Sequence, residues 1–292
     1  MPDLTHLVQI LVSGVGVGCI YGLIGIGFCV IYNASGIVNF GQGAFVMLGG
    51  IVTHVLLVRA GLPFVVAAVV ATALVAALGV AIERIVVRPL WDRSATMFVM
   101  ILATLAAQIV IERATLLAVG DQPKTLPNFT DLPPVRVGGV VVSWQILWIA
   151  GASLVLVGLL AAFFAKTRTG KAMRACAINR EAAALHGIPV TRMLAYSFAL
   201  SAGLGAIAGI LITPTQYTAF NVGVPFAISG FIAAILGGFG NALGAFFGGI
   251  MLGVLQALAI VLFGAGLKNV AALSVLLLFL LVRPSGLFGK AK

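Results

Sequence analysis

Two long stretches of the chain contain no Asp, Glu, Lys or Arg: one runs from Leu4 to Val58 and the other from Met193 to Leu267. An α-helix needs about 20 apolar residues to cross the hydrocarbon core of a bilayer. The first stretch therefore has room for two crossings and the second for three. Because 62% of the residues are hydrophobic and 8% are charged, a single soluble core could not bury the apolar surface, and the chain is predicted to lie in a membrane.

The apolar residues form nine candidate membrane segments, which are separated by short polar or glycine-rich connections. They span 7–32, 44–58, 63–82, 95–113, 145–165, 193–213, 225–239, 243–263 and 267–282. Two of them, 44–58 and 225–239, are short enough to be half-spans or parts of broken helices, so eight full crossings is an alternative. The predicted fold is an all-α, polytopic integral membrane helical bundle of eight or nine transmembrane segments, built as one domain over residues 1–292.

The distribution of Lys and Arg predicts the orientation of the bundle. The segments 83–95, 166–192 and 283–292 are rich in basic residues, whereas 114–144 balances its two basic residues with two acidic ones. Basic loops stay on the cytoplasmic side, so the first three segments are predicted to be cytoplasmic and 114–144 to be external. Within the external segment, "VRVGGVVVSW" predicts a small β-hairpin.

A sequence pattern occurs twice: "FGQGAFVMLGGI" at 40–51 resembles "FGNALGAFFGGI" at 239–250. Transporters are often built from two inverted halves whose glycine-broken helices meet near the membrane midplane. Chance similarity between Gly- and Phe-rich helices is the alternative, and the sequence leaves both open. Amides beside such breaks can face a water-filled path, although many intramembrane amides only join helices. The candidate pathway residues are Asn39, Phe40, Gly41, Gln42, Gly43 and Asn241.

The stretch "NREAAALHG" at 179–187 predicts a short polar helix within the cytoplasmic segment 166–192. Asn179 is a favourable N-cap, and Glu181 in the first turn suits the positive end of the helix dipole. Gly187 can adopt the left-handed conformation that ends a helix, and Pro189 prevents its continuation. Because two turns are not stable alone in water, this helix must dock on its own membrane domain or on another protein.

The residues "EAAALHG" match the Glu-Ala-Ala-x-x-x-Gly pattern of the coupling loop in membrane subunits of bacterial ABC importers. Together with "GIVNFGQGAFVMLG", "ERIVVRPL", "TRTGKAMRACAINREAAALHGI" and "LGGFGNALGAFFGGIMLGVLQAL", in this order, the whole chain resembles the LivH-type permeases of branched-chain amino-acid importers. It departs from them in two ways. The outer loop is shorter than is common in the family, and Gln42 takes the place of a His in the family's Asn-Phe-Ala-His-Gly stretch.

The resemblance implies a multi-pass permease subunit of the bacterial inner membrane that forms a pathway for apolar amino acids. It also implies four kinds of partner: a second homologous permease, two ATPase subunits, a periplasmic substrate-binding protein and the surrounding lipid. The polar helix would couple the permease to an ATPase through Arg174, Arg180, Glu181, Ala182, Ala183 and Gly187. An alternative function is a permease or channel for a small neutral solute, such as urea or a short amide.

Several other functions are not expected from the residues. The motifs "RTGKAM" and "LFGKAK" contain Gly-Lys, but Ala follows the Lys where a phosphate-binding loop has Ser or Thr, and no strand is expected before either motif. The chain is therefore not predicted to hydrolyse ATP. Cys19, Cys29 and Cys176 lack metal-ligand spacing, and neither a metal nor a cofactor is expected. The net charge of +10 is spread over the ends of apolar runs, which argues against binding of nucleic acid.

Overall fold

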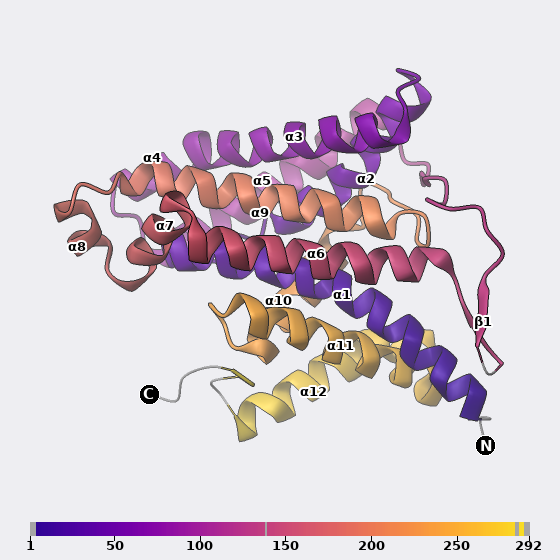
Figure 1. The fold of residues 1–292 in the computed structure, drawn as a ribbon. Coiled ribbons are helices and arrows are strands. Elements are labelled where there is room, and N and C mark those ends of the chain that lie inside the picture. The colour runs from indigo at the N-terminus through magenta and orange to yellow at the C-terminus, as the bar shows by residue number, and fades with distance from the viewer. Residues whose placement is uncertain (1–3, 138, 284–285, 289–292) are drawn as a thin grey trace. The chain divides into compact units, whose positions relative to one another are not determined.

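The structure is a computed structural model that describes residues 4–137, 139–283 and 286–288, and nearly all of its regular structure is helical (Figure 1). Nine apolar helices match the nine predicted segments in order. They are α1 (Leu4–Ser35), α2 (Gln42–Val58), α3 (Phe64–Ile82), α5 (Met97–Val119), α6 (Trp144–Lys166), α9 (Val190–Ile212), α10 (Gly223–Gly237), α11 (Ala242–Phe263) and α12 (Lys268–Val282). This pattern confirms an all-α membrane protein.

Seven of the described helical segments are long and apolar enough to cross a membrane, and the two shorter apolar helices are α2 and α10. These two are the segments that were predicted to be half-spans or parts of broken helices. The number of full crossings and the inverted repeat stay predictions. The predicted basic tail residues Lys290 and Lys292 lie outside the described residues.

The remaining elements lie in the connections. A π-helical turn (Glu83–Val87) and α4 (Arg88–Asp92) continue α3, while α7 (Arg168–Ile178) and α8 (Arg180–Leu185) join α6 to α9. A 3₁₀ turn (Ala265–Leu267) precedes α12. Strands β1 (Val135–Val137) and β2 (Val140–Val142) pair in antiparallel register, with Val135 opposite Val142, which confirms the predicted hairpin.

The chain divides into two compact units, and the first unit consists of Met1–Ile26, Pro127–Val157 and Ile228–Lys292. In this unit, glycines let the N-terminal part of α1 lie close to α11. A side chain at Gly18 would place its Cβ 2.7 Å from the Ile250 Cα, and one at Gly253 would meet the backbone of Gly14. In lipid the hydrophobic effect does not drive helices together, so close backbone packing of this kind stabilises their association instead. A buried hydrogen bond from Tyr21 Oη to Gln256 Oε1, at 2.9 Å, also joins the two helices.

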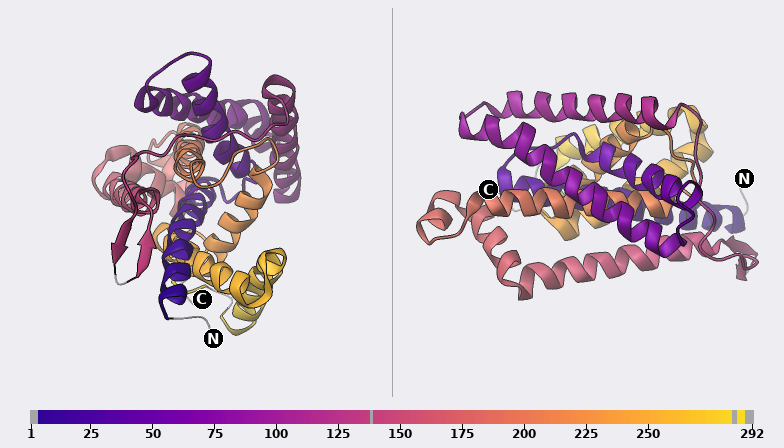
Figure 2. Two further views of the ribbon diagram at one scale, coloured as in Figure 1. Left: turned by 90° about the vertical axis from the view of Figure 1, so that its right-hand side faces the viewer. Right: turned by 90° about the horizontal axis from the view of Figure 1, so that it is seen from above.

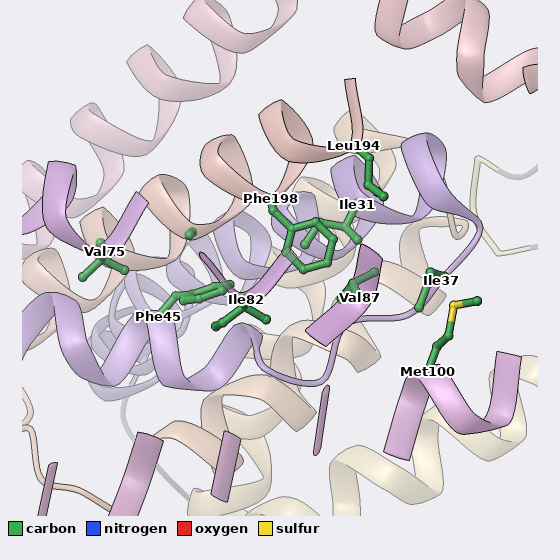
Figure 3. Close-up of a cluster of buried hydrophobic side chains, with 11 residues drawn as sticks. Ile31, Ile37, Phe45, Val75, Ile82, Val87, Met100, Leu194 and Phe198 are labelled. Carbon is green, nitrogen blue, oxygen red and sulfur yellow. The ribbon is translucent and has the colours of Figure 1, made fainter. Parts of the chain in front are cut away.

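The second unit consists of Gly27–Leu126 and Gly158–Ala227. Its core lies where α2 and α3 pack on α9, and Phe45, Val75 and Phe198 contribute buried side chains from these three helices (Figure 3). Gly49 faces the Ala206 backbone, so α2 and α9 approach closely. At one end of this unit, α7 and α8 leave the direction of the long helices and project beyond α6 (Figure 2). The unit therefore contains both the predicted polar helix and the break that precedes α2.

Candidate functional site

The helix α8 has the two predicted ends. The Asn179 Oδ1 atom accepts a hydrogen bond from the Ala182 N–H at 3.0 Å, which is an N-cap contact. At the other end, Gly187 has φ +78°, its N–H donates to Ala184 O at 2.9 Å, and the Ile188 N–H donates to Ala183 O at 3.0 Å. This pair of bonds is a Schellman motif. The cap and the left-handed glycine are thus confirmed, and local hydrogen bonds close both ends of α8.

The coupling segment α7–α8 has a buried face and a face that is open to solvent. Met173 and Cys176 of α7 and Ala183 of α8 are buried. By contrast, Ile178 at the end of α7 is 87% exposed and Leu185 of α8 is 88% exposed, and the charged residue Glu181, one turn before Leu185, is also exposed. Leu185 lies two residues after Ala183, so the two side chains leave the helix in nearly opposite directions. Large apolar side chains in a polar connection are typical of a surface that a partner covers.

Sequence reasoning missed Ile178 and Leu185 because it selected the residues that fit the family pattern. A usable signal was present, since Leu185 is a large aliphatic residue in a helix made otherwise of Ala and charged residues, and Ile178 comes shortly before that helix. Among the predicted coupling residues, Arg174, Glu181 and Gly187 are exposed, Ala182 is half-buried and Ala183 is buried. Their contact with an ATPase stays a prediction.

Arg180 is oriented differently from the other charged residues of α8. Its Cζ atom lies 4.7 Å from the centre of the Trp91 ring, so the guanidinium stacks on α4. Burial lowers the pKa of the Arg180 guanidinium, whereas the nearby Cys176 and Tyr32 act in the opposite direction. The contact brings the two basic segments 83–95 and 166–192 to the same end of the second unit.

The residues 36–41 form a break between α1 and α2. Gly36 has φ +65° and ends α1, and its N–H donates to Tyr32 O at 2.6 Å. Two α5 side chains accept hydrogen bonds from the backbone at the break and at the start of α2. The Phe40 N–H donates to Thr104 Oγ1 at 3.2 Å, and the Ala44 N–H donates to Gln108 Oε1 at 2.6 Å. Because these acceptors are four residues apart, they lie one above the other on one face of α5.

The amide of Gln42 lies in a buried contact with α9. Gln42 Oε1 accepts from Ser201 Oγ at 2.7 Å, and Gln42 Nε2 donates to Ser201 O at 3.2 Å. Gly27 of α1 leaves the space that this amide fills, because a Cβ there would contact Gln42 Nε2. The position where the resembled family has His thus holds a fully buried amide with both ends bonded.

Asn39 is also fully buried, but its amide is only half satisfied. Asn39 Oδ1 accepts from the Gly41 N–H at 3.0 Å. Within the described part of the chain, Asn39 Nδ2 is a buried donor without a hydrogen-bond partner. A buried polar atom of this kind is costly unless water or another group can reach it. The structure therefore brings Asn39, Gly41 and Gln42 together, while their role in a pathway stays a prediction.

Asn241 belongs to the first unit and has a capping role. Its Oδ1 atom accepts from the Gly244 N–H at 3.0 Å at the start of α11. Gly238 and Gly240, just before it, have φ +104° and +94°. The second copy of the repeated pattern therefore also lies where a helix begins after a glycine-rich turn. Asn241 therefore caps the first turn of α11.

The sequence profile described as "Branched-chain amino acid transport system / permease component" matches residues 10–282. The chain belongs to this family. A permease component is a transport subunit rather than the ATPase of the system, so the predicted absence of ATP hydrolysis in this chain agrees with the family.

The relatives of this family member align over nearly their whole length. The high-affinity branched-chain amino acid transport system permease protein BraD of Pseudomonas aeruginosa is 35% identical over 306 residues, which cover 99% of this chain and 98% of that protein. The permease protein LivH of Escherichia coli is 32% identical over 98% of this chain and 96% of that protein. A probable LivH from Methanocaldococcus jannaschii is 27% identical over 91% of this chain and 88% of that protein.

A solved structure shares the fold of this branched-chain amino acid permease component. PsaBC from Streptococcus pneumoniae, in complex with Fab, superposes with a TM-score of 0.54 over 97% of this chain and 94% of that chain, at 14% sequence identity. At this identity the likeness concerns the arrangement of the helices alone.

Proposed function

We propose that this permease component forms part of the translocation pathway for branched-chain or similar apolar amino acids across a bacterial inner membrane. It works with a second homologous permease, two ATPase subunits and a periplasmic binding protein that delivers the substrate. The names of the BraD and LivH relatives, which describe high-affinity branched-chain amino acid transport, support the substrate class. The chain's lack of a phosphate-binding motif fits an energy source on separate subunits.

The observation that carries the proposal is the pair of exposed apolar residues Ile178 and Leu185 on the coupling segment α7–α8. This segment lies outside the helices that are long and apolar enough to cross a membrane. Burial of one such side chain contributes about 1.5–3 kcal/mol. A groove on an ATPase subunit would bury both side chains and would face Glu181 and Arg174 at the rim. The Asn179 cap and the Schellman motif define both ends of α8.

The charge distribution supports a cytoplasmic position for this segment. The basic segments 83–95 and 166–192 meet where Arg180 stacks on Trp91. Under the positive-inside rule, this end of the second unit faces the cytoplasm, where ATPases would reach α8.

The break at 36–41 supports a pathway role for the neighbouring amides. Substrates with a polar amino-acid group need hydrogen-bond partners within the membrane, and Asn39 Nδ2 is a free donor there among the described residues. In the proposed pathway, Asn39, Phe40 and Gly41 line the route, and Gln42 and Gly43 hold the start of α2 against α9 and α10. Asn241 is proposed to act at the corresponding break before α11.

The test is co-purification of candidate ATPase subunits with the permease, together with uptake by reconstituted vesicles that contain the binding protein. The double variant Ile178→Asp, Leu185→Asp should lose the ATPases and ATP-driven uptake, while the permease still inserts. Leu132→Asp is the matched control, since Leu132 is also exposed, at 58%, but lies in the predicted external segment. Normal ATPase binding by the double variant would exclude this surface as the docking site.

A further inference from the structure

Arg180 connects three parts of the second unit that are far apart in the sequence. It is the first residue of α8, its guanidinium stacks on Trp91 of α4, and it also approaches the end of α1. Arg180 lies close to Gly36, because a Cβ on Gly36 would be only 2.8 Å from Arg180 Nη2. The three heavy atoms nearest to that Cβ position all belong to the Arg180 guanidinium. The side chain of Arg180 therefore covers the backbone of Gly36.

Gly36 meets two requirements at this contact. Its φ of +65° is the left-handed conformation that ends α1, which residues with a Cβ adopt at a cost. The missing side chain also leaves the space that the guanidinium occupies. The C-terminus of a helix carries a partial negative charge, so a cation beside Gly36 is electrostatically favourable. Arg suits the position better than Lys, because its planar group can stack on the indole and remain charged when half-buried.

The residues that follow Gly36 are those of the candidate pathway. Gly36 begins the break 36–41, which contains Asn39 and leads directly to Gln42 and its buried contact with Ser201. A short irregular segment between two long helices is where a backbone can change direction without disturbing the helices. The side chain of Arg180 thus connects the coupling segment α7–α8 to the break 36–41.

We propose that Arg180 is a positioning residue that transmits movement of α8 to the break 36–41, rather than a residue that contacts the ATPase. This inference rests on the proposed coupling function of α8. When an ATPase displaces α8, Arg180 moves with it and carries the Gly36 backbone and Trp91. The exposed residues Ile178 and Leu185 receive the movement, and Arg180 passes it to the segment that holds Asn39.

The test uses the complete transporter, with ATPases and binding protein, in vesicles that allow uptake and ATP hydrolysis to be measured together. Arg180→Gln should keep the ATPases bound and hydrolysing, but the number of substrate molecules moved per ATP should fall about tenfold. Arg180→Lys and Trp91→Phe, which keep the charge or the aromatic ring, should show smaller reductions. Arg59→Gln is the matched control, because Arg59 at the end of α2 is exposed, lies outside the coupling segment and should leave the ratio unchanged.

A second measurement follows the contact itself through the fluorescence of Trp91. Replacement of Trp144 and Trp148 by Phe leaves Trp91 as the single tryptophan of the chain. Nucleotide binding should change the Trp91 emission in this background, and Arg180→Gln should abolish the change. A normal ratio of uptake to hydrolysis in Arg180→Gln, with the ATPases bound, would overturn the inference. Failure of the Ile178 and Leu185 variant to release the ATPases would instead overturn the proposed coupling function.

Discussion

The carboxylate of Glu83 is fully buried and forms an ion pair with Arg88, with 3.1 Å between Glu83 Oε1 and Arg88 Nε. The two residues are five positions apart, and in a regular α-helix they would lie on different faces. They meet because the backbone forms a π-helical turn, in which the Arg88 N–H donates to Glu83 O. Pro89, one residue later, lacks an N–H and crowds the preceding turn, which favours such a distortion. Arg88 also reaches Thr191 O, at 3.5 Å.

Replacement of Arg88 by Ala should leave the Glu83 carboxylate buried without its partner. The loss of stability should be about 3 kcal/mol, because a buried charge without a partner is expensive. Arg84→Ala, at the exposed neighbouring cation, should cost much less. Thermal unfolding of the purified permease in detergent measures both. The double variant Arg88→Ala, Glu83→Gln should recover part of the loss, and equal effects of Arg84→Ala and Arg88→Ala would contradict the assignment of the pair.

Local patterns in the sequence predicted a large part of this structure. Charge-free runs gave the nine apolar helices, since the membrane requires length and apolarity of each segment by itself. Asn179 and Gly187 gave the ends of α8, because capping depends on residues a few positions apart. The hairpin at 135–142 followed from a similarly local pattern.

The contacts that define the candidate site could not be predicted in the same way. Gln42 and Ser201 are 159 residues apart, and the sequence identified Gln42 as an unusual amide without identifying its partner. Arg180 and Trp91 meet only because two connections lie at the same end of the second unit. The Glu83–Arg88 pair depends on a local departure from α-helical geometry. The first two contacts depend on tertiary packing, and the third depends on a local backbone distortion that the 3.6-residue helical periodicity does not reveal.

The two glycines that flank Gln42 should respond differently to substitution. A Cβ at Gly43 would meet the backbone carbonyl of Gly223, which cannot move aside easily, so Gly43→Ala should reduce the yield of folded protein. A Cβ at Gly41 would lie 3.0 Å from Asn39 Oδ1 and 3.7 Å from Thr104 O, so Gly41→Ala should fold. Monodisperse protein on size-exclusion chromatography distinguishes the two variants.

Gly41→Leu then tests the pathway rather than the fold. If the break lines the route, this variant should assemble with its partners and lose most of the uptake that the wild type shows in the same vesicles. The control is Gly203→Leu on α9, where a Cβ would have its nearest contact at 3.9 Å, with Thr72 Cγ2. Uptake by Gly41→Leu at the rate of the control would remove Gly41 from the proposed pathway.

Gly187 should be sensitive to substitution because of its backbone conformation alone. Nothing lies within 4 Å of a Cβ at this position, so a side chain would meet no steric obstacle. The φ of +78° nevertheless disfavours a β-branched residue by about 1–2 kcal/mol or more. Gly187→Val should therefore misplace the end of α8 and weaken ATPase co-purification, whereas Gly187→Asn, which tolerates this conformation, should retain it. Equal retention by both variants would show that the Schellman motif does not matter for docking.

Glu181 provides a test of charge on the same helix. Its side chain is exposed at the first turn of α8, where a negative charge is favoured by the helix dipole. Glu181→Lys should weaken ATPase binding and lower substrate-stimulated ATP hydrolysis, while Glu181→Gln should have a smaller effect. Both variants should insert in normal amounts, because the side chain is exposed. If ATPase binding is the same in Glu181→Lys and the wild type, Glu181 does not contribute to the docking surface.

Cys176 and its neighbour Ala177 allow orientation and burial to be tested on one helix. The Cys176 thiol is buried, and burial raises its pKa, an effect that the nearby Arg180 partly offsets. Maleimides react with the thiolate, so at neutral pH Cys176 should react slowly, and its rate should keep rising at pH values where an ordinary thiol has already titrated. Ala177 is exposed, so in a background without the native cysteines Ala177→Cys should react about tenfold faster or more.

A membrane-impermeant maleimide should reach Ala177→Cys only from the cytoplasmic face, and Thr125→Cys, at the predicted external connection, only from the opposite face. Reaction of both introduced cysteines from the same face would overturn the proposed orientation, and with it the position of α8 on the side of the ATPases.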